Sequence, residues 1–162
     1  MLFRSIDLAL KAVPEVEPGI HYVERQFGVL EVHSREPADV QKAGEAILAG
    51  IGAKAEDGLR PRILYTDVIE DVTDQHAVIV NRNREASMLL PGQTLLVVEV
   101  TPALFAAVAA NAAEQVAPGA TLVTVSMIGA AGRVYLAGST PDIVLARDEI
   151  TRVLEGVRGR PG

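Results

Sequence analysis

The three histidines are the residues of this sequence best suited to bind a metal or to transfer a proton. His21, His33 and His76 have no mutual spacing typical of metal ligands, although His21 and His33 would approach each other across a hairpin. A catalytic zinc site would also need a third ligand and a second shell of hydrogen bonds that orients the ligands. We therefore predict no metal site.

Neither the hydroxyl groups nor the carboxylates form a catalytic constellation. Ser87 and Ser139 have no glycine elbow and no neighbouring His and Asp to activate a nucleophile. The carboxylate pairs at residues 70–71 and 148–149 are adjacent in sequence, so their members point to different faces. The chain also has no cysteine, no phosphate-binding glycine loop and no calcium loop. We predict that the protein is not an enzyme and has no cofactor.

The charge distribution argues against nucleic acid and membrane partners. The net charge is -6 and aromatic residues make up only 4%, so the sequence offers neither clustered phosphate contacts nor stacking platforms. Arg82 and Arg84 would suit an anion or a neighbouring carboxylate, or would simply form a solvated turn. No stretch reaches the ~20 apolar residues of a membrane helix, and charges interrupt the N-terminus, so we expect neither a membrane span nor export.

The elements that would position these residues follow from the apolar pattern. Apolar residues recur at helical spacing over residues 4–13, and a second helix is predicted to begin at Pro37 and to extend to Ile51. Between them, residues 20–34 predict a β-hairpin with its turn near Gly28.

The middle of the chain predicts three strands and a helix. Two strand-like runs occupy residues 63–72 and 76–81. Residues 94–100 form a nearly continuous β-branched and leucine run, which is typical of a strand covered on both faces. Pro102 is predicted to open an Ala-rich helix that extends to Val116.

The pattern of the first forty residues then returns. The Pro-Gly pair at residues 118–119 repeats the pair at 18–19, residues 121–139 predict another hairpin, and Pro141 opens another helix as Pro37 does. Repetition at this distance indicates two copies of one α/β unit and not a solenoid, whose periods are about 20 to 50 residues.

The polar stretch near residues 53–60 marks the boundary and gives two repeats, residues 1–55 and 56–162. Each repeat would have helices on one side of its sheet, which makes an α+β sandwich whose remaining edges need partners. Such units tend to assemble.

Several segments resemble the shell proteins of bacterial microcompartments. DLALKAV at residues 7–13 is similar to the family's first-helix segment, and VSMIGAAGRVYLAGS at 125–139 is similar to its pore-loop hairpin. Residues 23–34 and 76–100 resemble a tandem-domain, circularly permuted subtype from shells linked to amino-alcohol and aminoketone metabolism. The resemblance covers essentially the whole chain.

The resemblance implies two tandem BMC shell-domain repeats of ferredoxin-like, permuted α/β type. Residues 60–93 would supply the strands that close the second repeat, whereas the first repeat would lack its opening strands. Members of this type form homotrimers that imitate a hexagon, here called tiles, which pack beside other shell proteins in the bacterial cytoplasm. A central pore would pass small metabolites.

The resemblance also implies which residues line the pore. In the second repeat these are Met127, Ile128, Gly129, Ala130, Ala131 and Gly132, although a plain glycine hairpin turn would explain the same residues. In the first repeat they are Glu24, Arg25, Gln26 and Phe27. Copies of Glu24 and Arg25 around the axis would place alternating charge at the aperture, or the two would form an ordinary surface salt bridge.

Tile-edge residues are implied in the same way. Lys11 matches the lysine that lies where neighbouring tiles abut, with Asp7 beside it, and Gln115 takes the corresponding position in the second repeat. Without the resemblance, Lys11 is simply the solvated i,i+4 partner of Asp7 on a helix.

Three functions are compatible with these observations. A structural shell tile accounts for the resemblance in both repeats. An oligomeric small-ligand-binding regulatory module would explain the repeat but not the match of residues 76–100. An enzyme with a site between subunits is the weakest alternative, because no catalytic constellation converges.

Overall fold

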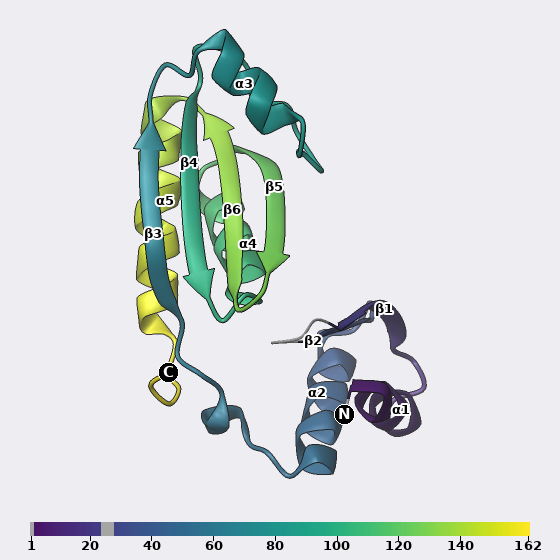
Figure 1. The fold of residues 1–162 in the computed structure, drawn as a ribbon. Coiled ribbons are helices and arrows are strands. Elements are labelled where there is room, and N and C mark those ends of the chain that lie inside the picture. The colour runs from purple at the N-terminus through teal and green to yellow at the C-terminus, as the bar shows by residue number, and fades with distance from the viewer. Residues whose placement is uncertain (1, 24–27) are drawn as a thin grey trace. The chain divides into compact units, whose positions relative to one another are not determined.

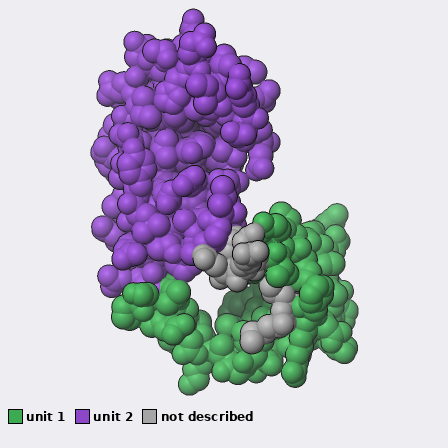
Figure 2. Space-filling model, in the orientation of Figure 1, with its two compact units in different colours: residues 1–59, 158–162 green, residues 60–157 purple. Residues whose placement is uncertain are grey.

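The computed structural model describes residues 2–23 and 28–162. The chain divides into two compact units, which Figure 2 shows in different colours. Unit 1 comprises residues 1–59 with 158–162, and unit 2 comprises residues 60–157. In the described part of the chain, no helix is both long and apolar enough to cross a membrane.

Unit 1 contains two helices, a two-stranded antiparallel sheet and a 3₁₀ turn. Its elements are α1 (Leu2–Ala12), β1 (Glu17–Val23), β2 (Gly28–His33), α2 (Pro37–Ile51) and η1 (Ala55–Asp57). Its buried core is small and consists of Ala9, Val13, Val16 and Ala43. Pro37 fits the first turn of α2, where no amide donor is needed, and Gly52 ends the helix in a left-handed conformation with φ 70°.

Unit 2 is a four-stranded antiparallel sheet with helices. Its elements are β3 (Arg62–Ile69), α3 (Asp74–Asn81), β4 (Thr94–Thr101), α4 (Phe105–Val116), β5 (Thr121–Ile128), β6 (Ala131–Gly138) and α5 (Thr140–Gly156). The strand order is β3-β4-β6-β5. In Figure 1, α4 and α5 lie together behind the sheet.

The main core of unit 2 fills the space between the sheet and the two helices α4 and α5. It contains Leu96, Val98 and Val100 of β4, alanines of α4, and the apolar stripe of α5. A second cluster covers one end of the opposite sheet face, where Leu89 and α3 pack against Leu95. The first residues of β4 are therefore covered on both faces, as the sequence predicts. Farther along β4, the face that lies away from α4 and α5 is partly exposed at Glu99.

The run HAVIVN at residues 76–81 is part of helix α3, so its prediction as a strand was wrong. Thr73 is the N-cap residue of this helix: its side-chain oxygen accepts a hydrogen bond from the amide of His76 over 3.4 Å. The side-chain amide of Asn81 then makes two hydrogen bonds with the backbone of Leu89, of 2.8 and 2.9 Å. The N-cap and the contacts of Asn81 with the loop favour the helix over the β-propensity of the valines and the isoleucine.

The order helix, hairpin, helix occurs once in each unit, as α1-β1-β2-α2 and as α4-β5-β6-α5. The Pro-Gly pairs do not occupy equivalent positions, because residues 18–19 lie within β1 whereas residues 118–119 precede β5. β3 and β4 complete the sheet of unit 2.

Helix α4 begins at Phe105 and not, as the sequence predicted, at Pro102. The amides of Phe105 and the two following residues make the tighter i→i−3 hydrogen bonds of turns.

Candidate functional site

The β5–β6 turn carries the residues that we predicted to line a pore in the second repeat. Ile128 ends β5 with 67% of its surface exposed, and Gly129 adopts a left-handed conformation with φ 61°. The carbonyl of Ala130 accepts a hydrogen bond from Thr101 Oγ1 over 3.1 Å, which ties the turn to the end of β4. The turn is therefore short and uncharged, and its hydrogen bond to Thr101 fixes it to the end of β4.

Not every residue of this segment is exposed in unit 2. Met127 and Ala131 are half-buried, whereas Gly132 is fully buried. A Cβ atom on Gly132 would collide with the carbonyl oxygen of Ala103 and would come within 2.7 Å of Ala106 Cβ. Glycine is thus required at position 132 for the close approach of β6 to the start of α4. Whether residues 127–132 line a pore stays a prediction.

The predicted pore residues of the first repeat, Glu24, Arg25, Gln26 and Phe27, lie outside the described residues. The strands on either side of them are paired, and Val23 of β1 lies opposite Gly28 of β2. The predicted hairpin over residues 20–34 is therefore confirmed by its two strands, and the charged aperture stays a prediction.

The predicted tile-edge residues lie on α1 and α4. Lys11 Nζ contacts Asp7 Oδ2 at 2.7 Å, and the two side chains are 74% and 56% exposed. Gln115 is exposed on α4, one residue before the helix ends, and Lys11 has the same position on α1. The ion pair confirms the i,i+4 expectation, whereas the role of these residues at an edge between tiles stays a prediction.

A polar row that the sequence reasoning missed crosses the open face of the unit 2 sheet. The strand register aligns Tyr65, Glu99, Arg133 and Ser126 on β3, β4, β6 and β5. Arg133 Nε donates to Glu99 Oε2 over 2.6 Å, and this hydrogen bond raises the pKa of the guanidinium. Tyr65 donates to Asp67 over 2.9 Å, which raises the pKa of the phenol. The sequence signal for this row is the one glutamate, Glu99, within the otherwise uncharged run at residues 94–100.

The histidines do not converge. His33 lies opposite Glu17 and within 3.5 Å of its carboxylate, whereas His21 lies opposite Leu30 and packs edge-on against Phe3. Within the described ranges, no three His, Asp or Glu side chains are arranged to hold a metal ion.

Ser87, Ser139 and the arginines at residues 82 and 84 are either bonded to nearby backbone or exposed to solvent. Ser139 caps α5 by accepting from the amide of Asp142 over 3.4 Å. Ser87 is exposed and its amide bonds the edge of β5. Arg84 donates to the carbonyl of Ala86 over 3.4 Å, and Arg82 is exposed at the end of α3.

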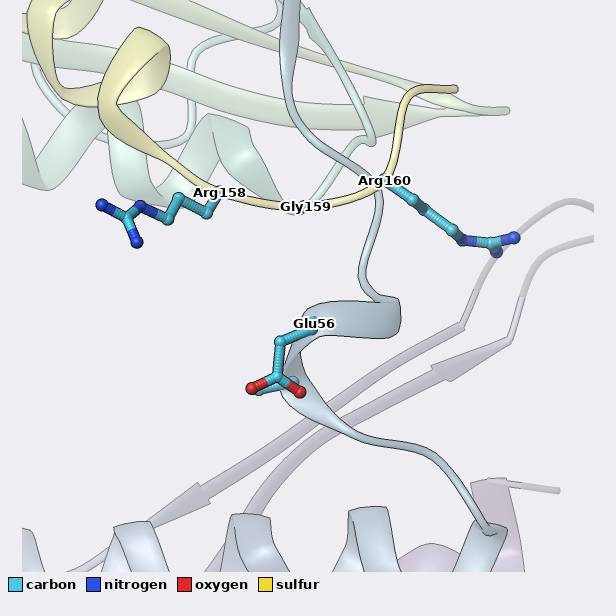
Figure 3. Close-up of a pocket in the computed structure, with 5 residues that line it drawn as sticks. Glu56, Arg158, Gly159 and Arg160 are labelled. Atoms are coloured by element: carbon cyan, nitrogen blue, oxygen red, sulfur yellow. The ribbon is translucent and has the colours of Figure 1, made fainter.

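A hollow with two arginines in its lining does not form an anion clamp. It has a volume of about 620 Å³ and is lined by Ala55, Glu56, Arg158, Gly159 and Arg160 of unit 1. Figure 3 shows the side chains of Arg158 and Arg160 extending in opposite directions, with Glu56 below them. Arg160 is also committed to the carbonyl of Asp57, to which its Nε donates over 2.8 Å.

Sequence comparisons identify related shell proteins. Residues 1–57 match the family model described as the CsoS1D N-terminal domain. The chain is 40% identical over 157 residues to the carboxysome shell protein CcmP of Synechococcus elongatus, covering 97% of this chain and 73% of CcmP. It is 39% identical over 144 residues to the carboxysome shell protein CsoS1D of Hydrogenovibrio crunogenus, covering 88% of this chain and 69% of that protein.

Solved structures give the same result. A double-ringed trimeric shell protein from the RMM microcompartment has a TM-score of 0.96 and 67% sequence identity, with 99% of this chain and 78% of that chain covered. A fused permuted hexameric shell protein from the same microcompartment has a TM-score of 0.88 and 43% identity, with 96% and 77% covered.

Proposed function

The chain belongs to the tandem-domain microcompartment shell proteins, a structural and non-enzymatic family that includes CsoS1D and CcmP, and from this premise we propose that it forms a trimeric tile with an axial pore. The tile would occupy the shell of a bacterial microcompartment in the cytoplasm, beside other shell proteins.

The observation that carries the proposal is the recurrence of helix, hairpin and helix in two units of one chain. Three such chains around a three-fold axis present six similar units, which is the number that a hexagonal tile needs. The 67% identity to a shell protein described as trimeric supports this number of chains.

The proposed pore would be lined by the β5–β6 turn and by residues 24–27. The turn at Gly129 offers small side chains and backbone groups, so it leaves an aperture open where several chains converge. The segment at residues 24–27 supplies Glu24 and Arg25, whose copies would present both charges to a passing metabolite. Together they would favour small polar molecules.

Light scattering on the purified chain, followed by negative-stain imaging of the same sample, tests the assembly. We expect particles of about three times the 17.2 kDa chain mass that associate into flat sheets. A monomer or dimer at all protein concentrations contradicts the tile.

A double variant then tests the pore. Replacing Glu24 and Arg25 with glutamine should leave the trimer mass unchanged and should change the relative rates at which anionic and cationic solutes leave assembled shells. Equal rates for the wild-type and variant shells would remove the charged turn from the pore.

A further inference from the structure

Arg133 and Glu99 are the only charged residues of the described strands β4, β5 and β6. They lie opposite each other on β6 and β4, and Arg133 Nε is 2.6 Å from Glu99 Oε2. The charged residues of β3, Arg62 and Asp67, lie two strands away from β6, at ~10 Å. Within unit 2, the pair therefore dominates the charge around the β5–β6 turn.

The pair is close to this turn and on its exposed side. Counted from the turn, Arg133 is in the third residue pair of β5 and β6, opposite Ser126. Gly132 packs against the start of α4. Because side chains alternate along a strand, Arg133 and Ile128 both face away from the helices, two residues or ~7 Å apart along the hairpin. Figure 1 shows this end of the sheet, where β4 ends beside the turn.

Arg133 presents its positive charge to solvent more fully than Glu99 presents its negative charge. The two side chains are 45% and 23% exposed. A guanidinium has five N–H donors, and the bond to Glu99 uses one of them and holds the group in place. A solute that approaches the turn along this face therefore meets a cation before the counter-ion of that cation.

From this arrangement we propose that Arg133, positioned by Glu99, makes passage at the β5–β6 turn favour small anions over cations of the same size. The inference rests on the proposed function, because the field of Arg133 acts on a passing solute only where this turn borders a pore. Copies of Arg133 around a three-fold axis add their fields, as rings of charge do in channels. Arg133 lies outside both segments proposed above to line the pore.

Relaxation of the Ile128 methyl protons by charged nitroxides measures the field at the turn. A carboxyl- and an aminomethyl-substituted nitroxide have opposite charges and similar sizes, so the ratio of their effects reports the local enrichment of anions. At about 10 mM salt, a unit charge ~7 Å away changes the concentration of a monovalent ion about threefold. Arg133→Gln should therefore lower the anion-to-cation ratio at least about threefold, and Glu99→Gln should raise it.

Two controls separate charge from structure in this measurement. Arg147→Gln removes an arginine that is paired with Asp148 on α5, away from the open face, and should leave the ratio at Ile128 unchanged. In 1 M salt, where the screening length is about 3 Å, the differences between wild type and the two variants should disappear.

Efflux from assembled shells then connects the field with passage. Shells loaded with acetate, methylammonium and glycerol should release acetate relative to methylammonium at least about threefold more slowly in Arg133→Gln than in wild type. Glycerol is neutral, so its rate should not change. Ile128→Trp enlarges a side chain that is 67% exposed at the turn and should slow all three solutes.

The outcomes distinguish the inference from the pore on which it rests. An unchanged nitroxide ratio in Arg133→Gln, or shifts of the same sign in Arg133→Gln and Glu99→Gln, overturns the inference. An unchanged efflux ratio in Arg133→Gln also overturns it when Ile128→Trp slows glycerol. If Ile128→Trp leaves glycerol efflux unchanged, the proposed pore fails, and the role of Arg133 in passage fails with it.

Discussion

Gly132→Ala is a sharp test of how the candidate pore turn is held. The added methyl group would meet the carbonyl oxygen of Ala103 and, at 2.7 Å, the Cβ of Ala106. Neither atom is the end of a flexible side chain, because one is a backbone oxygen just before α4 and the other is a Cβ atom in the first turn of α4. The strand and the helix must therefore move apart at the point where β6 begins.

The expected loss of stability follows from two opposing effects. Overpacking of a tight contact costs ~1–3 kcal/mol, whereas replacing glycine with alanine stabilises by ~0.4–1 kcal/mol through the unfolded chain. The net loss is about 1–2 kcal/mol. For a unit of roughly 100 residues, this lowers the melting temperature by about 5–15 °C.

Circular dichroism melting at one fixed protein concentration measures the effect. Gly156→Ala is the matched control, because no atom lies within 4 Å of a Cβ atom at this position at the end of α5, and its melting temperature should stay level or rise. A melting temperature of Gly132→Ala within about 1 °C of wild type would refute the requirement for close approach.

Two further predictions concern charged side chains. Lys11→Ala should abolish sheets in negative stain while the trimer mass persists, and its melting temperature should change little because an exposed i,i+4 pair contributes only ~0.3–0.5 kcal/mol. The hydrogen bond from Arg152 lowers the pKa of Glu149 below its ordinary value of 4.5. The ionised carboxylate therefore stabilises the folded state at pH values above 4.5, and this stabilisation is lost as the pH falls through the lower pKa of the folded state. Glu149→Gln should therefore make melting temperature less sensitive to pH below 4.5, as pH-dependent melting curves would measure.

The sequence predicted most helices and hairpins because their boundaries carry local chemistry. Pro37 and Pro141 mark the first turns of α2 and α5, and the two hairpins have regular apolar runs on both sides of a turn. Boundary residues were not a uniform guide, because α4 begins three residues after Pro102. Thr73 before α3 does indicate the element correctly, since an N-cap residue precedes a run that looks like a strand.

The candidate site could be predicted only in part. The i,i+4 contact of Lys11 depends on a single helix and follows from spacing alone. The polar row on the unit 2 sheet depends on residues from four separate strands, which only the tertiary fold brings together. Likewise, the need for glycine at position 132 comes from Ala103 and Ala106 around the start of α4 and leaves no mark in the residues that flank it.

The two units show how one sequence pattern acquires different burial. In α5, the stripe Ile143, Ala146, Ile150 and Leu154 is fully buried. In α2, Val40, Ala43, Ile47 and Ile51 have the same spacing, yet only Ala43 is buried and Ile51 is 37% exposed.

The difference arises because α5 packs against β3 and β4, which have no counterpart among the described residues of unit 1. The hairpin of unit 1 likewise exposes Ile20 and Val23, at 62% and 58%. Apolar side chains stabilise a fold only when they are removed from water, so the exposed part of the α2 stripe adds no stability to unit 1 by itself. The stripe on α2 therefore contributes less to the stability of unit 1 than the stripe on α5 contributes to unit 2.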